Sequence, residues 1–266
     1  MSLYFNNAKR KLDLNFIVMS NVDLYKSLLD GSVKSVSIPS SVKSLPGFSG
    51  CTSLETITFE EPCQIKNFKY RGFENCSALT EITIPNSITS IGSYCFSGCK
   101  QLSSVTFEEP CQLTTISDCC FSQTNLKSFK FPSSVKTFGL FALSYCPELT
   151  SIIVSNSIQS LPDAQCFEGC PKLSEIIFEE PCQIKKLPYY CFYNLPSLTE
   201  ITIPDSVTSI GDKAAAVSEI CVAIFVQVNG TDKQISIEAK VQRDEDSYKI
   251  ILTLLPKHSF ENTPFL

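Results

Sequence analysis

Histidine and the short motifs of nucleotide and metal chemistry are almost absent from this sequence. The one histidine, His258, lies near the end of the chain with no cysteine or serine motif close to it. No G-x-G-x-x-G, P-loop or H-E-x-x-H motif occurs, so nothing points to a nucleotide or a catalytic zinc ion. Nothing recommends a Ser-His or Cys-His pair assembled from distant residues either. We therefore predict that the protein is not an enzyme and has no catalytic residue and no cofactor.

Basic clusters and long apolar runs are also missing. The formal net charge is −5, and residues 9–11 (KRK) form one short basic cluster. Nucleic acids and anionic membranes need clustered Lys and Arg, so neither is expected as a principal partner. The most apolar run, residues 220–228, is too short for a membrane span, which needs about 20 residues. Asp13 and Asn15 interrupt the stretch after the basic cluster, so we expect no clear signal peptide.

What the sequence does contain is a repeat. Its units share the skeleton L-x-x-I-x-[IF], then [IV]-x-x-[IL], then [CA]-F and C-x-x-L, over residues 33–213. The leucines that open the units lie 23 to 25 residues apart. These leucines are Leu54, Leu79, Leu102, Leu126, Leu149, Leu173 and Leu198. Periods of this length are typical of leucine-rich repeats, whose units stack because one unit cannot bury its apolar face alone.

The apolar positions of one unit predict the shape of a coil. In the unit that begins at Leu79, Ile82 and Ile84 follow at strand spacing, and Ile88 and Ile91 lie on the return path. An aromatic residue, a cysteine and the next leucine close the coil. Stacked coils would pair their strands in parallel. We predict a leucine-rich-repeat solenoid of about eight repeats, an α/β-type right-handed superhelix with a parallel β-sheet and few short helices.

One stretch of the repeat is similar to a known family. Residues 84–99 (IPNSITSIGSYCFSGC) resemble the repeat of BspA-type leucine-rich-repeat proteins, which occur in bacteria and in some parasitic protists. Residues 38–42 (IPSSV) and 203–211 (IPDSVTSIG) repeat parts of it. The resemblance covers about two thirds of the chain. It implies a surface or secreted protein that adheres to other cells or to matrix proteins and performs no chemistry.

Fourteen cysteines occur, most of them at fixed repeat positions. One column precedes the closing leucine or its equivalent by three residues, and a second precedes the aromatic residue. The first comprises Cys51, Cys76, Cys99, Cys146 and Cys170, and the second Cys95, Cys120, Cys166 and Cys191. Other units carry Gly72 or Ala142 in the second column, which indicates selection for small buried side chains. Parallel Cβ vectors disfavour disulfides, and C-x₃-C pairs roughly 15 Å apart cannot share a zinc ion.

A longer form of the repeat carries paired acidic residues. The sequence FEEPCQ occurs at residues 59–64, 107–112 and 178–183, where it should bulge at the end of a strand. Paired glutamates suggest glycosidase carboxylates or a calcium site. However, the three bulges would lie about 10 and 15 Å apart, and adjacent residues of an extended segment point to opposite sides. We therefore expect a solvated acidic ridge and no metal site.

The strand residues between core positions form the candidate binding surface. Side chains alternate across a strand, so these residues should line one exposed face. The predicted binding residues are Thr83, Thr106, Lys130, Ile153, Ile177 and Thr202. Ile153 and Ile177 beside Lys130 are the most distinctive part of this row. Two interpretations fit these residues: a binding site, or only the high β-propensity of isoleucine on a solvated sheet.

The two ends of the chain depart from the repeat. Residues 1–32, with a short helix at 21–29, are predicted to cap the first coil. Residues 214–266 are predicted to form a β cap or a small separate module. Within them, residues 220–228, 234–241 and 248–255 read as strands, and Asn229-Gly230 is a favoured hairpin turn between the first two. We expect these strands to dock on the last coil, because three strands need a covered apolar face.

The sequence thus predicts a non-catalytic binding protein that presents its sheet face to a partner. The resemblance implies a host, matrix or other cell-surface protein as that partner, with a glycan as an alternative, and a location at the cell surface or outside the cell. An intracellular scaffold of the same fold is the second interpretation. The missing signal peptide and the many unpaired thiols favour the cytoplasm.

Overall fold

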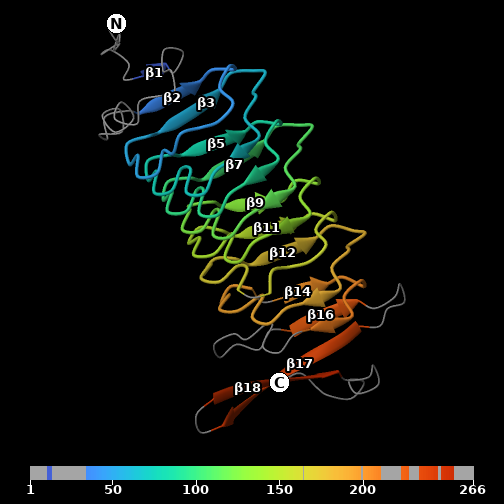
Figure 1. The fold of residues 1–266 in the computed structure, drawn as a ribbon. Helices are drawn as coiled ribbons and strands as arrows, with labels where there is room; N and C mark the ends of the chain where they lie inside the picture. The colour runs from blue at the N-terminus through green and yellow to red at the C-terminus, as the bar shows by residue number, and fades with distance from the viewer. Residues whose placement is uncertain are drawn as a thin grey trace, which may run out of the picture.

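A computed structural model describes residues 11–13, 34–163, 165–198, 200–210, 223–227, 234–244 and 247–254. Stacked coils of chain form an elongated solenoid, with strands following one another in chain order from β2 to β16 (Figure 1). The predicted leucine-rich-repeat solenoid with parallel strand pairing is therefore confirmed.

The first sheet collects the strand that opens each coil. Neighbouring strands pair in parallel and in register, as Ile82 with Val105 in β5 and β7 and Ile152 with Ile176 in β11 and β12. Its strands are β1 (Lys11–Asp13), β2 (Ser35–Ile38), β3 (Thr56–Phe59), β5 (Glu81–Ile84), β7 (Ser104–Phe107), β9 (Ser128–Lys130), β11 (Ser151–Val154), β12 (Glu175–Phe178), β14 (Glu200–Ile203) and β16 (Ala223–Gln227). The hydrogen-bonded ladder is divided into segments, with breaks between β3 and β5, β7 and β9, and β12 and β14. Burial alternates along the strands, which places every second side chain in the core.

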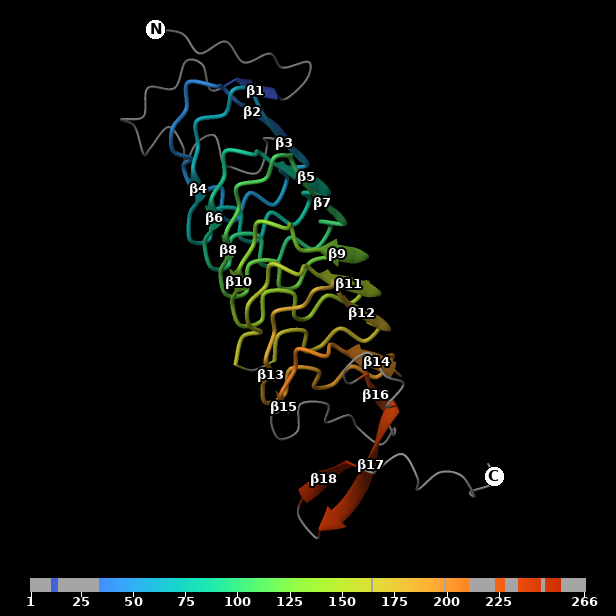
Figure 2. The same ribbon diagram turned by 90° about the vertical axis from the view of Figure 1, so that its right-hand side faces the viewer.

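The second sheet consists of two-residue strands on the return path, on the opposite side of the solenoid (Figure 2). They are β4 (Asn67–Phe68), β6 (Ser90–Ile91), β8 (Thr115–Ile116), β10 (Thr137–Phe138), β13 (Lys186–Leu187) and β15 (Ser209–Ile210). The first four form one ladder and the last two another. The second residue of each strand from β4 to β13 points into the core.

Turns, not helices, form the third side of each coil. The described residues contain no helix, which differs from the few short helices expected. The physical reason is a pair of left-handed residues four positions apart, such as Tyr94 (φ 60°) and Gly98 (φ 74°). A right-handed helix cannot continue through such positions. Hydrogen bonds between coils stabilise this side instead, as from the Phe73 amide to the Cys95 carbonyl at 2.8 Å.

The core lies between the two sheets and contains a column of stacked phenyl rings. Phe48, Phe73, Phe96 and Phe121 stack with ring centroids 5.2 to 5.4 Å apart and interplanar angles of 6° or less. All four are buried. Each ring comes from a different coil, so the column joins successive repeats through aromatic contacts.

The phenyl column is interrupted at Leu143, which takes the aromatic position in its coil. Rings from other positions of that coil occupy the space beside it. Phe129 lies 5.2 Å from Phe121, and Phe138 lies 6.1 Å from Phe167, so both neighbours of the missing ring keep an aromatic partner. This coil thus has leucine where its neighbours have phenylalanine, and phenylalanines at two other positions of the coil fill the space. Cores tolerate such changes when the total side-chain volume is conserved.

The last strands extend the first sheet beyond the repeat. β16 pairs in parallel with β14, matching Ile201 with Ile224. β17 (Gln234–Asp244) is antiparallel to β16, and β18 (Ser247–Leu254) is antiparallel to β17. All three segments predicted as strands therefore contain one, and the first pairs with the last coil. The predicted turn at Asn229-Gly230 and helix at 21–29 lie outside the described residues. The division into 1–32, 33–213 and 214–266 stays a prediction.

Candidate binding surface

The structure places the predicted binding row on the outer face of the first sheet. Five of its six members are exposed and Ile153 is half-buried. They do not all adjoin: pairing brings Thr83 beside Thr106, Lys130 beside Ile153, and Ile153 beside Ile177. Ladder breaks separate these two groups from each other and from Thr202. The row therefore consists of a threonine pair, a mixed apolar and basic group, and a further threonine.

Lys130 is held by an ion pair that the sequence did not predict. Its Nζ lies 2.8 Å from Oε1 of Glu179, which follows β12, so the pair spans β11. Ile153, on β11, is the register partner of Lys130. Ile177 remains 42% exposed, an unusual value for an isoleucine in a regular strand. Of the distinctive group, Ile177 is thus the most accessible apolar residue.

An open groove lies beside Ile177, where the ladder stops between β12 and β14. Its volume is about 600 Å³. Glu175 and Ile177 of β12 line one side, Thr202 and Pro204 line the other, and Glu180 lies in the following turn. The sequence predicted Ile177 and Thr202 as binding residues but did not include the acidic and proline residues of the groove among them. The FEEPCQ motif at residues 178–183 marked Glu180 as an acidic residue of the surface. Its place in the groove depends on how the turn after β12 folds.

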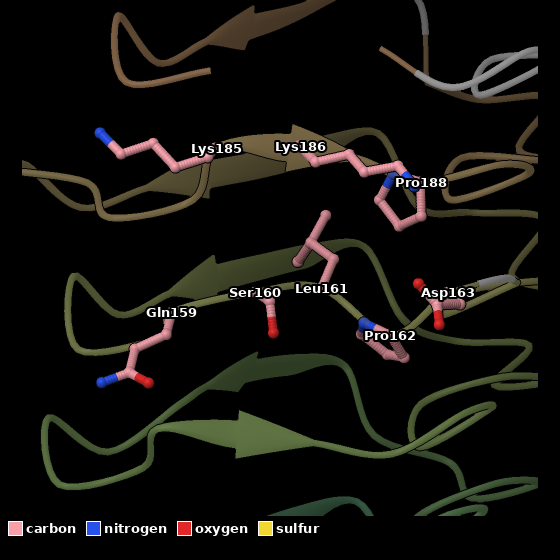
Figure 3. Close-up of a pocket in the computed structure, with 8 residues that line it drawn as sticks. All are labelled: Gln159, Ser160, Leu161, Pro162, Asp163, Lys185, Lys186 and Pro188. Atoms are coloured by element: carbon pink, nitrogen blue, oxygen red, sulfur yellow. The ribbon is translucent and has the colours of Figure 1, made fainter. Parts of the chain in front are cut away.

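A second hollow opens on the opposite face, at a break in the second sheet. It has a volume of about 330 Å³ and is lined by residues 159–163 and by Lys185, Lys186 and Pro188 (Figure 3). In other coils the residue after the short strand donates its amide to the preceding coil, as Gly139 does to the Ile116 carbonyl at 2.9 Å. Pro162 and Pro188 have no amide hydrogen to donate there. Two prolines in neighbouring coils thus account for the break.

The acidic pairs are more ordered than a solvated ridge. In all three FEEPCQ motifs the second glutamate folds back, and its Oε2 accepts the amide hydrogen of the cysteine two residues later. The three N···O distances are 3.1, 2.8 and 2.8 Å, and each glutamate precedes a cis-proline. The first glutamates behave differently: Glu179 pairs with Lys130, and Glu108 accepts from the Asn86 amide at 3.3 Å. These carboxylates shape turns, and the described residues hold no group of three potential metal ligands.

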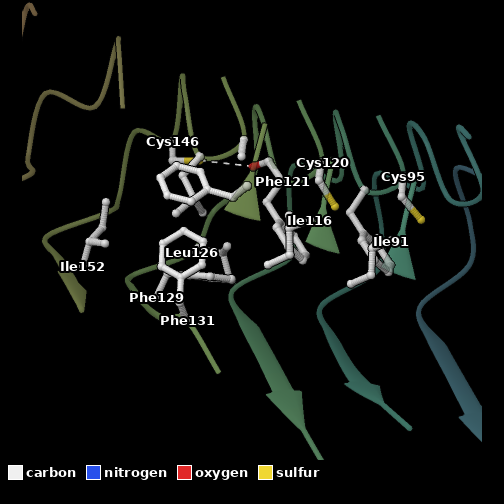
Figure 4. Packing of buried hydrophobic residues seen from close by; sticks show 14 of the residues in the cluster. Ile91, Cys95, Ile116, Cys120, Phe121, Leu126, Phe129, Phe131, Cys146 and Ile152 are labelled. Atoms are coloured by element: carbon white, nitrogen blue, oxygen red, sulfur yellow. Dashed lines mark hydrogen bonds between the residues drawn. The ribbon is translucent and has the colours of Figure 1, made fainter. Parts of the chain in front are cut away.

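The cysteine columns lie in the core, as predicted from their positions. In the first column four thiols, from Cys76, Cys99, Cys146 and Cys170, donate to a carbonyl of the preceding coil. The Cys99 thiol donates to Phe73 at 3.1 Å, and the Cys146 thiol to Phe121 at 3.3 Å, the second of which is drawn in Figure 4. Burial raises the pKa of Cys99 and of Cys166 to about 12. Twelve cysteines of the described part, Cys51 and Cys99 among them, are free thiols. In the first column, burial of the cysteine is therefore combined with a hydrogen bond that alanine could not make.

No helix among the described residues has the length and apolarity to cross a membrane.

Comparison with known proteins places this architecture among repeat proteins. The sequence pattern described as the BspA type leucine rich repeat region matches residues 28–148 and 110–221, in six copies. No curated protein matches the sequence.

Several solved bacterial structures are similar to this chain. The pneumococcal vaccine antigen PcpA is 21% identical, with 75% of this chain and 63% of that chain covered and a TM-score of 0.43. A leucine-rich-repeat protein from Eubacterium ventriosum is 25% identical over 69% and 58% of the two chains, with a TM-score of 0.47. A leucine-rich cell surface protein from Faecalibacterium prausnitzii is 23% identical over 69% and 70%, with a TM-score of 0.35. The chain thus spans less than two thirds of the first two proteins.

Proposed function

The chain belongs to the family of BspA-type leucine-rich-repeat proteins, and from this premise we propose that it is a non-catalytic binding protein whose first sheet face contacts a partner. The observation that carries the proposal is the change along that face. The outward position is threonine in β3, β5, β7 and β14, but lysine or isoleucine in β9, β11 and β12. The core does not require this change, because the position points outward in every coil. An extended sheet face is the usual binding surface of a solenoid.

The size of the face bears on the kind of partner. The eight strands of the first sheet from β2 to β14, at about 4.8 Å spacing, extend roughly 40 Å, and about four residues per strand give a width of about 13 Å. The area is on the order of 500 Å², compared with about 800 Å² per partner in a standard protein interface. A partner segment that lies along the face fits this area better than a broad globular surface. We propose a host, matrix or other cell-surface protein as the partner, with a glycan as the alternative.

Substitutions on opposite faces of the same two coils test the proposal. Thr83→Arg with Thr106→Arg places two long side chains on neighbouring strands of the first sheet. Ser90→Arg with Thr115→Arg does the same on the second sheet, where these residues are register partners. Binding of each labelled protein to immobilised matrix proteins and to intact cells is the readout.

The first pair, or a separate Ile153→Arg variant, is expected to weaken binding at least tenfold. The second pair is the control and should stay within twofold of the unsubstituted protein. Equal losses from both faces, or no loss from the first face in either variant, would refute the proposed binding surface.

The location proposed with this function is the cell surface or the medium outside the cell, in line with the family resemblance. An intracellular scaffold is the second candidate, and the many free thiols favour it, since extracellular proteins commonly oxidise their cysteines. Protease treatment of intact cells separates the two. Complete protection of the protein, with digestion after lysis, would support the scaffold and contradict a surface location.

A further inference from the structure

Resting on the proposed function, we infer that the groove between β12 and β14 binds an extended segment of the partner protein through a lysine or arginine side chain. The groove is defined by Glu175, Ile177, Glu180, Thr202 and Pro204. It extends the predicted row at its most apolar point, next to Ile177. Its lining combines two chemistries, an apolar floor and two carboxylates, and each restricts the ligand.

The charge of the groove is negative and is not neutralised from within. Two carboxylates line it, from Glu175 and Glu180, and no lysine or arginine does. Neither carboxylate forms an ion pair within the described part of the chain. Lys130, the basic residue of the same sheet face, is paired with Glu179. A cationic ligand therefore meets charges that the protein leaves uncompensated.

The apolar floor selects the shape of that cation. Glu175 and Ile177 are both exposed and two residues apart on β12, so their side chains share the outer face. That spacing corresponds to about 7 Å along the strand. A lysine or arginine side chain has an apolar stem and a charged head, and can cover an isoleucine with the stem while its head reaches the carboxylate. A small inorganic cation would make no use of Ile177.

A metal ion is a poor fit for a second reason. Calcium needs six to eight oxygen ligands at about 2.3–2.6 Å. No three potential ligands gather around one point in the described residues, and Oε2 of Glu180 already accepts the Cys182 amide at 2.8 Å. The remaining polar residues of the lining, Ser174 and Thr202, supply neutral hydroxyls. An organic cation on an extended peptide uses all of these groups.

The repeat supplies matched control residues. Threonine occupies the position of Ile177 in β3, β5, β7 and β14, so Ile177→Thr recreates an outward residue that four other coils accommodate. Glu81 is the equivalent of Glu175 on β5, away from the groove. Glu109 is the equivalent of Glu180, with the same hydrogen bond to the following cysteine amide. Substitution of these two residues by glutamine changes the net charge equally at a distant site.

The experiment measures fluorescence anisotropy of labelled, end-capped hexapeptides added to the full chain. The test peptide alternates lysine with valine, and control peptides replace lysine by glutamine or by glutamate. The lysine peptide is expected to bind more tightly than both controls. Its affinity should fall when NaCl is raised from 50 to 500 mM, because the Debye length shortens from above 10 Å to below 5 Å.

Variants then locate the site. Ile177→Thr is expected to weaken the lysine peptide about fivefold, since roughly half of an isoleucine side chain is available for burial. Glu175→Gln should weaken it about threefold, in the range of exposed ion pairs. Glu81→Gln and Glu109→Gln should stay within twofold. Thermal unfolding of each variant shows whether the fold is intact.

Several results would overturn the inference. They are no binding of the lysine peptide at millimolar concentration, equal binding of the glutamate peptide, or equal effects of Glu81→Gln and Glu175→Gln. Failure of the peptide test with retained sensitivity of matrix-protein binding to Thr83→Arg and Thr106→Arg would leave the proposed function intact. Peptide binding as expected, without any effect of those face variants on protein binding, would instead refute the proposed function.

Discussion

The stacked phenyl column allows a quantitative test of how the coils are joined. Phe96 is fully buried and stacks on Phe73 at 5.2 Å and on Phe121 at 5.3 Å. Phe96 also makes an edge contact with Phe68 at 6.0 Å. Phe96→Leu removes all three ring pairs, each contributing about 0.5–1.5 kcal/mol beyond area burial. A residual void of roughly 20 Å³ would add about 0.5 kcal/mol. The expected loss in free energy of unfolding is therefore about 2–5 kcal/mol, although leucine is a native residue at this position in another coil.

Urea unfolding followed by circular dichroism measures this loss. Repeat proteins can unfold in segments, so the slope of the transition must be reported together with its midpoint. A loss below about 0.5 kcal/mol at unchanged slope would refute the claim that stacked rings join the coils, because one ring pair at the lower limit together with the void would already exceed it.

The coil with Leu143 provides the reciprocal experiment. Leu143→Phe would complete the column, but Phe129 and Phe138 already contact the rings on either side. Overpacking should cost about 1–3 kcal/mol. Adding Phe138→Ile should recover part of this cost, because isoleucine is the residue of the preceding coils at that position. Strict additivity of the two substitutions would show that the neighbouring rings do not compensate for Leu143.

Three further predictions concern the thiols, the turns and the acidic corners. The pKa of about 12 for buried Cys99 and Cys166 lies above the unfolded value of about 8.5, so their contribution to stability is full below pH 8.5 and is lost as pH rises toward 12. At pH 10 each should contribute about 2 kcal/mol less to the free energy of unfolding than at pH 7, and Cys99→Ala should reduce the pH dependence measured by urea unfolding. Gly98→Ala should lower the free energy of unfolding by about 1–2 kcal/mol, because Gly98 has φ 74° and alanine disfavours that region; an unchanged urea midpoint would contradict this. Glu109→Ala should cost about 0.5–1 kcal/mol through loss of the hydrogen bond to Cys111, whereas glutamine should retain most of it, and equal thermal shifts for the two variants would argue against that role.

The difference between expected helices and observed turns shows the limit of periodicity. The apolar columns fix which residues of a coil face inward, but they do not report backbone dihedral angles. In the third side of the coils, Arg71, Tyr94 and Phe141 adopt left-handed values of 55°, 60° and 56°. None of these residue types favours that region, so the residue types alone could not predict the left-handed backbone at these positions. The second left-handed position is clearer, since glycine or asparagine occurs there in several coils, as at Asn75 and Gly98.

The acidic corners show the same limit for side chains. Adjacent glutamates in an extended segment point to opposite sides, which correctly separated the two members of each pair. Whether a carboxylate meets water, a lysine or its own turn depends on the path of the following residues. Oε2 of Glu61 turns back to the Cys63 amide at 3.1 Å. Glu179 reaches Lys130, 49 residues earlier in the chain, at 2.8 Å.

The sequence by itself determined the repeat, the residues of the core and the row that faces outward. It could do so because every coil must bury the same columns, and a strand with one buried face permits only one assignment of its side chains. Only the tertiary structure decided where the ladders break and which outward residues meet across coils. The ion pair of Lys130, the proline-lined hollow and the groove beside Ile177 all depend on contacts between coils. Such contacts follow from the length and backbone path of each stacked coil, and a one-dimensional pattern does not contain them.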